Sequence, residues 1–166
     1  MKIFYKFIDI IILIFFIILQ IVFAQQLKLY YLNFDFLLVI IVAITFKEGL
    51  TQGMIYGFFA GIIFDLLSSK IIGISPLILS LDSFIIGKLI QAGLRPKIQS
   101  YIFSVFIISE INTITINLIY YLFGFNFDFI TISVDLLLNP VCNIILIFII
   151  FPLMRVKFSG DELIEY

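Results

Sequence analysis

The stretch EGLTQGMIYGFFAGIIFD, residues Glu48–Asp65, has a glycine at every fourth position and ends in a carboxylate. The glycines are Gly49, Gly53, Gly57 and Gly61. Steps of four stay near one face of an α-helix, so they predict a groove along which another helix backbone can approach closely. Glycine costs a helix about 1 kcal/mol relative to alanine in water, and close packing in a membrane offsets that cost. We expect the groove to pack against another helix of this chain. The alternative is a surface that docks a partner protein or a second copy.

Asp65 stands at the end of this glycine face, followed by Ser68, Ser69 and Lys70. A carboxylate near the end of a span can reach the membrane interface at lower cost than one at the centre. We expect Asp65 to fix the following turn by hydrogen bonds to backbone groups or serine hydroxyls. The alternative is an acid that binds a partner or handles protons.

The composition indicates an integral membrane protein. Of the 166 residues 63% are hydrophobic and only 13% charged, where a soluble domain has about 25% charged residues. Mean hydropathy is +1.26. The net charge of −1 gives no basic field for nucleic acid, so we expect no nucleic-acid partner.

The chemistry-bearing residues form no complete catalytic set. The chain has no histidine and a single cysteine, Cys142, so neither an intrachain disulfide nor a transition-metal site is expected. A carboxylate dyad needs two acids about 3 Å apart, and no Gly-x-Gly-Asp motif accompanies Asp82 or Glu110. We therefore predict a non-enzyme with no catalytic residues, no metal and no cofactor.

Six apolar segments are long enough to be considered as membrane helices, which need about 17–25 residues each. They are residues 3–23, 29–46, 49–67, 71–90, 101–124 and 129–154. The links between them are short, so residues 1–166 form one all-α membrane domain. The first segment, with Lys2, Lys6 and Val22-Phe23-Ala24, also resembles a signal peptide, but its long apolar stretch favours a retained span.

The cations predict the orientation. With the N-terminus inside, eight Lys and Arg residues fall on the inner side and two, Lys28 and Lys70, on the outer side. The positive-inside rule therefore places both termini in the cytoplasm. The eight inner cations are Lys2, Lys6, Lys47, Lys88, Arg95, Lys97, Arg155 and Lys157.

Polar residues recur inside three of the spans. They are Asp82; Glu110 and Asn117; and Asp135, Asn139 and Asn143. Within each of the last two spans they fall at helical spacing, and polar groups in membrane helices usually face the bundle interior. We expect a buried polar network. It would suit structural locking, a small-molecule pocket or an ion path.

The stretch GMIYGFFAGIIFDLLSSKIIGISPLILSLDSFIIGKL, from Gly53 to Leu89, resembles the core of the MreD family of rod shape-determining membrane proteins. The family has a glycine-rich helix that reaches an aspartate, then a polar turn and a glycine eight residues after the aspartate. The matching positions here are Gly57, Gly61, Asp65 and Gly73.

Weaker likenesses flank this core. NFDFLLVIIVAI resembles the family's second segment, with Asn33-Phe34 where a proline is usual, and Glu110 matches an acidic position of span five. Asn143 and the terminal FPLMRVK resemble the last span, whereas Asp82 has no counterpart in the family pattern.

The resemblance implies a multi-pass, non-enzymatic component of the lateral wall-elongation machinery in the bacterial inner membrane. Implied partners are the membrane-anchored periplasmic scaffold MreC, the filament protein MreB and the wall polymerase–transpeptidase pair. The glycines, Asp65 and Gly73 would serve helix packing or the partner interface, and a homodimer stays open.

The family is similar in architecture to the S-components of energy-coupling-factor transporters, and a vitamin-binding S-component is the alternative function. S-components usually carry an Ala-xxx-Ala face on span one, yet the first span here has no alanine before Ala24. Their ligands often stack on tryptophan, which this chain lacks. Both departures favour the scaffold interpretation. Whether the polar interior holds a lipid or a small ligand stays open.

Overall fold

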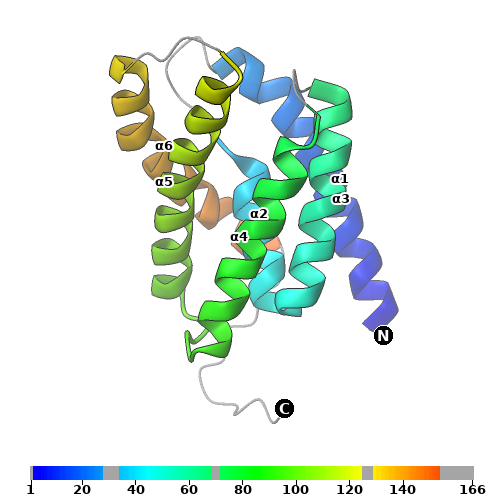
Figure 1. Ribbon diagram of the computed structural model, residues 1–166. Helices are drawn as coiled ribbons and strands as arrows, with labels where there is room; N and C mark the ends of the chain where they lie inside the picture. Colours follow the sequence, from blue (N-terminus) through cyan, green and yellow to red (C-terminus); the bar gives the residue numbers. More distant parts are fainter. Residues whose placement is uncertain (1, 28–33, 69–71, 125–128, 154–166) are drawn as a thin grey trace.

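The computed structural model describes residues 2–27, 34–68, 72–124 and 129–153. These residues form six α-helices and no strand, arranged as one bundle (Figure 1). The helices are α1 (Lys2–Leu27), α2 (Phe36–Glu48), α3 (Leu50–Ser68), α4 (Ile74–Gln91), α5 (Ile98–Leu122) and α6 (Phe129–Leu153). Helices α3, α4, α5 and residues 132–150 of α6 are each long and apolar enough to cross a membrane, and α1 contains a shorter apolar stretch, Phe7–Val22. The chain is thus built as a multi-pass membrane protein.

Helix α2 is the centre of the bundle. Each of the other helices contacts it, and all residues from Phe36 to Thr45 are buried. A helix that is apolar all round can be buried in a protein core or face lipid, and here the neighbouring helices cover it. The packing of the whole molecule is therefore organised around this one element.

The start of α2 differs from the sequence prediction of a span over 29–46. The helix begins at Phe36, after non-helical Phe34 and Asp35, and its 13 residues extend only about 20 Å. A bilayer core is about 30 Å thick. Non-helical backbone is tolerated at membrane depth where protein surrounds it, and here side chains of α1 and α6 bind it. Hydropathy alone could not reveal this, since residues 29–35 are themselves largely apolar.

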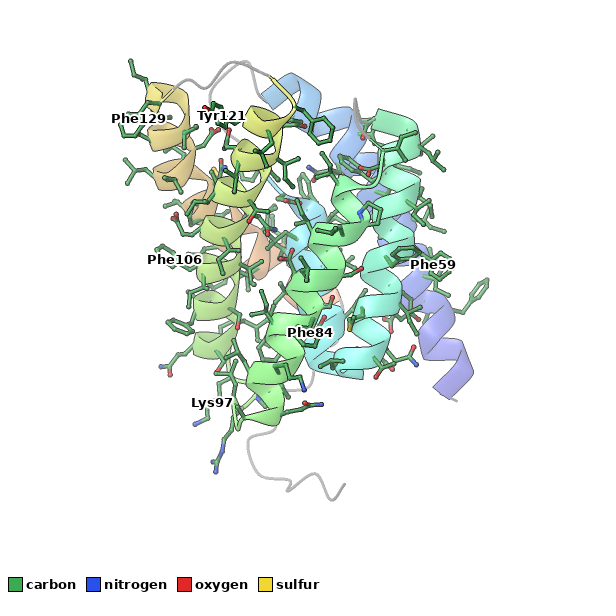
Figure 2. The ribbon with its side chains drawn as sticks, in the orientation of Figure 1. Phe59, Phe84, Lys97, Phe106, Tyr121 and Phe129 are labelled. Carbon is green, nitrogen blue, oxygen red and sulfur yellow. The ribbon has the colours of Figure 1, made fainter. Side chains whose placement is uncertain are left out.

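The other helices turn apolar side chains outward. Phe59, Phe106 and Phe129 project from the periphery (Figure 2). In water such a surface would mark an interaction site, but on helices of this length lipid is its natural solvent. The start of α1, the α2–α3 junction and the α4–α5 turn lie at one end of the bundle (Figure 1), so consecutive helices run in alternating directions.

Candidate functional site

Gly57 and Gly61 lie directly against the backbone of α4. An ideal Cβ at Gly57 would stand 2.7 Å from the carbonyl oxygen of Leu79 and 2.9 Å from its carbon. One at Gly61 would overlap the backbone nitrogen and Cα of Pro76. Ala60, fully buried between them, keeps the same surface low. The glycine groove of α3, formed by these two residues, is therefore occupied by the next helix of the same chain.

Two further glycines permit close contacts elsewhere. A Cβ at Gly53 would overlap the hydroxyl of Thr45 on α2, and a Cβ at Gly87 on α4 would overlap Leu50 at the start of α3. The α3–α4 pair is thus held closely at both ends. Gly87 was not among the residues expected from the sequence, although a glycine inside an apolar helix is itself a sign of close packing.

Gly49 and Gly73 serve backbone geometry instead. No atom lies within 4 Å of an ideal Cβ at either position, so Gly49 lies outside the groove, contrary to the expectation from its spacing. Its φ of 86° and ψ of 178° fall in a region that essentially only glycine adopts. Gly73, with φ 106° and ψ −11°, is the left-handed residue before α4. These glycines form the turns on either side of α3.

Asp65 joins the end of α3 to the start of α4. Its buried carboxylate oxygen Oδ2 accepts hydrogen bonds from the backbone N–H of Gly73 (2.7 Å) and of Ser75 (3.2 Å). The first N–H groups of a helix have no partner within the helix, and a carboxylate there also interacts favourably with the helix dipole. Asp65 therefore caps α4 from the preceding helix, in the place where the sequence suggested that it fixes the turn.

An apolar groove of about 480 Å³ lies on the outer side of this junction. Its lining comprises Phe58, Ile62, Gly73, Pro76, Leu77, Ser80 and Leu81. The hydroxyl of Ser80 donates to the backbone oxygen of Pro76 (2.6 Å), so it does not offer its proton to the groove. The groove is consequently an apolar surface feature rather than a polar ligand site.

Asp82 lies in the interior, where Asn112 Nδ2 donates to its Oδ2 at 2.8 Å. Both residues are buried, on α4 and α5 respectively. This hydrogen bond connects two helices that make few other contacts with each other. The sequence indicated Asp82 but missed Asn112, because it placed the inward face of α5 at Glu110 and Asn117.

Asn143 on α6 binds the non-helical entry to α2. The backbone N–H of Asp35 donates to its Oδ1 (2.8 Å), and its own Nδ2 donates to Ser109 Oγ on α5 (2.9 Å). Gln20 of α1 binds the same entry, since its Oε1 accepts from Phe36 N–H (2.8 Å) and its Nε2 donates to the backbone oxygen of Phe34 (3.2 Å). The Asp35 carboxylate completes the cap by accepting from Leu38 N–H (3.0 Å).

The remaining predicted polar residues are less central. Asn139 Nδ2 donates to Thr113 Oγ1 (3.2 Å) across the α5–α6 contact, whereas Asn117 donates to the backbone oxygen of Thr113 within its own helix (2.7 Å). Glu110 and Asp135 are only partly buried. Asn139 and Asn143 thus bind neighbouring positions of α5, which are themselves joined because Thr113 Oγ1 donates to the backbone oxygen of Ser109 (2.9 Å). Asp82 makes its contact with Asn112, at a different position of α5.

A second feature that the sequence analysis missed lies at the opposite end of the bundle. Lys47 Nζ donates to both carboxylate oxygens of Asp9, at 2.7 and 2.6 Å, and the Asp9 side chain is only 4% exposed. This ion pair attaches α1 to α2. Asp9 shares the buried stripe of α1 with Leu13, Phe16 and Gln20, and that helical spacing was the available sign.

Comparison with known protein families decides the identity. The profile described as rod shape-determining protein MreD matches residues 1–157 of the 166. The chain belongs to the MreD family. The match to MreD covers all six helices, from the start of α1 to the end of α6. Neither the search of curated proteins nor the search of solved structures gave a significant match.

The residues that match the MreD family pattern have a common structural role in this chain. Gly57, Gly61, Asp65 and Gly73 all act at one place, the α3–α4 contact and the turn that leads into it. Among the residues the structure describes, no cluster of His, Cys, Asp and Glu side chains could hold a metal ion.

Proposed function

We propose that this rod shape-determining membrane protein is a non-enzymatic scaffold of the complex that controls cell shape and lateral peptidoglycan synthesis. The observation that carries the proposal is the family match over residues 1–157. In the scaffold role the protein holds other membrane proteins in register, for which a bundle with fixed helix contacts is suited.

The contacts of the buried carboxylates support a structural role for this protein. Asp9 is paired with Lys47, Asp65 caps α4, and Asp82 accepts a hydrogen bond from Asn112. A catalytic acid needs access to the proton it transfers, whereas these carboxylates are engaged between helices. The same contacts favour a scaffold over a ligand-binding S-component.

The partner proposed is MreC, bound in the bacterial inner membrane, with MreB and the wall polymerase–transpeptidase pair as further neighbours. The orientation proposed has both termini in the cytoplasm, which places the α4–α5 turn on the MreB side. The six helices together with this charge distribution support that orientation.

Co-purification tests the proposal. The full chain, tagged and extracted from membranes of cells that also produce MreC, is expected to retain MreC. Mass spectrometry of the purified protein is expected to show no stoichiometric vitamin-like ligand. Phe59→Leu, on the exposed face of α3, serves as a control that should keep both yield and MreC. A folded wild-type chain that retains a vitamin-like ligand and no MreC would refute the scaffold role.

A further inference from the structure

The last turn of α4 and the connection to α5 carry three exposed cations, Lys88 in the helix and Arg95 and Lys97 after it. The sequence from Ser83 to Ser109 contains no Asp or Glu, and none of the three cations forms an ion pair with the described residues. No acidic residue in this part of the sequence therefore compensates the positive charge of the three cations. We name the three residues the basic turn.

The basic turn has a defined backbone. Gly93, with φ 105°, donates from its N–H to the oxygen of Ile90 (3.0 Å), and Leu94 N–H donates to the oxygen of Leu89 (3.0 Å). Lys97 N–H donates to the oxygen of Arg95 (2.8 Å). These bonds end α4 and start α5 within a few residues, so the three cations lie close together along the chain, at the tip of the helical hairpin where Figure 2 labels Lys97.

Apolar residues border the basic turn on the lipid-facing side. Leu89 and Ile98 are each 37% exposed, and Phe84, one turn further into the membrane, is 41% exposed. The ammonium of Lys88 lies 5.7 Å from the centre of the Phe84 ring. The charges thus stand where an apolar membrane face meets its polar end, which is the level of phospholipid headgroups.

We propose that the basic turn binds the phosphate groups of anionic phospholipids. Charge complementarity selects the anion, and the adjoining apolar face selects a lipid over a soluble acidic segment, because the acyl chains continue along Phe84 and Leu89. Arginine holds a phosphate through two parallel hydrogen bonds, and a lysine supplies a point charge. The inference needs only that this end lies at a membrane surface. In the orientation proposed above, that surface is the inner leaflet.

The test measures lipid binding to the full chain purified in a neutral detergent. Phosphatidylglycerol, with phosphatidylcholine as the zwitterionic comparison, is titrated in and bound lipid is counted by native mass spectrometry. We expect preferential binding of phosphatidylglycerol that weakens with added salt. The triple variant Lys88→Gln/Arg95→Gln/Lys97→Gln should bind about 100-fold more weakly, at about fivefold for each cation. Lys28→Gln/Lys70→Gln, which removes the two cations that the proposed orientation assigns to the outer side, should bind as the wild type does.

Three results would overturn the proposal. One is equal binding of phosphatidylglycerol by the wild type and by a triple variant that keeps the wild-type melting temperature. Another is equal affinity for phosphatidylcholine and phosphatidylglycerol. The third is binding that arises only after Asp161→Asn/Glu162→Gln/Glu165→Gln, because the chain's own acidic C-terminal residues would then be the occupant of the basic turn.

Discussion

Asp65 and Asp9 show what single carboxylates do in this bundle. Each is nearly inaccessible and has partners on another segment: two backbone N–H groups for Asp65, and the Lys47 ammonium for Asp9. A buried charge is tolerated only when it is paired or hydrogen-bonded. Substitution can measure what each of these contacts contributes, since Asp65 accepts from two backbone N–H groups and Asp9 accepts from an ammonium.

Replacement of Asp65 should separate the role of its oxygen from that of its charge. Asp65→Ala removes the acceptor for Gly73 and Ser75 N–H and should destabilise the protein by about 1 kcal/mol, as the loss of a helix cap does. Asp65→Asn keeps one acceptor oxygen and should lose less. Thermal unfolding in detergent provides the comparison. An Asp65→Ala melting temperature equal to that of the wild type would show that the cap is dispensable.

Removal of one partner from the Asp9–Lys47 pair should be more severe. Asp9→Ala leaves a largely buried ammonium, and Lys47→Ala leaves a buried carboxylate, so each should lose about 3 kcal/mol. The double variant should lose less than the sum of the two, since it leaves neither charge alone. Unfolding free energies from SDS titration give the double-mutant cycle. Strict additivity would mean that the two groups do not interact energetically.

Helices α3 and α4 meet backbone to backbone, which is how membrane helices gain attraction where burial of apolar surface brings none. Side chains at Gly57 or Gly61 would meet main-chain atoms of Leu79 and Pro76. Main-chain atoms of a helix cannot rotate out of the way as the end of a side chain can. The contact should therefore tolerate little added volume at these two positions.

An alanine series along α3 should rank these contacts. Gly61→Ala should be the most damaging, then Gly57→Ala, with losses of about 1–3 kcal/mol from overpacking. Gly53→Ala should follow, because rotation of the Thr45 hydroxyl removes the closest overlap at the loss of its hydrogen bond to Ile41, although Cβ and Cα of Thr45 stay 2.9 and 3.1 Å away. Thr51→Ala, exposed on the same helix, is the control. Folded yield and melting temperature are the measurements, and equal values for Gly61→Ala and Thr51→Ala would contradict the close contact.

The whole molecule consists of one buried helix inside five that face lipid. Among the described residues, α2 supplies nearly half of the fully buried apolar side chains, yet it has no lipid-facing surface of its own. The basic turn and the Asp9–Lys47 pair lie at the end of the bundle where α1 begins. The proposed orientation rests on the distribution of Lys and Arg along the sequence.

Labelling of single cysteines should report this orientation. With Cys142 replaced by alanine, Gln99→Cys in the first turn of α5 should resist a membrane-impermeant maleimide in intact cells and react after permeabilisation. Asn126→Cys, between α5 and α6, should react in both conditions. Labelling of Gln99→Cys in intact cells would reverse the proposed topology.

Much of the architecture followed from the sequence because long apolar runs have few folding options in a membrane. The bounds of α3, α4 and α6 lie within about three residues of the predicted spans. The start of α2 was missed because hydropathy does not distinguish apolar residues such as Phe34, which is not helical, from those that form a helix in lipid.

The positions of some glycines and polar residues could not be predicted from their spacing in the sequence. Spacing alone grouped Gly49 with Gly57 and Gly61, although its backbone conformation, which spacing does not encode, separates it from them. On α5 the buried face runs through Ser104, Ile108 and Asn112, because α2 and its neighbours fix the rotation of the helix. The polar residues Glu110 and Asn117 therefore marked a different face.

The hydrogen bond at the entry to α2 can form only after most of the chain has been synthesised. The N–H of Asp35 is bound by Asn143, which lies 108 residues later in the chain. At the usual 5–20 residues per second, a ribosome needs about 5–20 s to supply that partner. Until then Gln20 is the only described side chain from outside α2 that can bind this entry. A chain that stops before α6 would therefore leave the Asp35 N–H without the Asn143 side chain that binds it in the complete bundle.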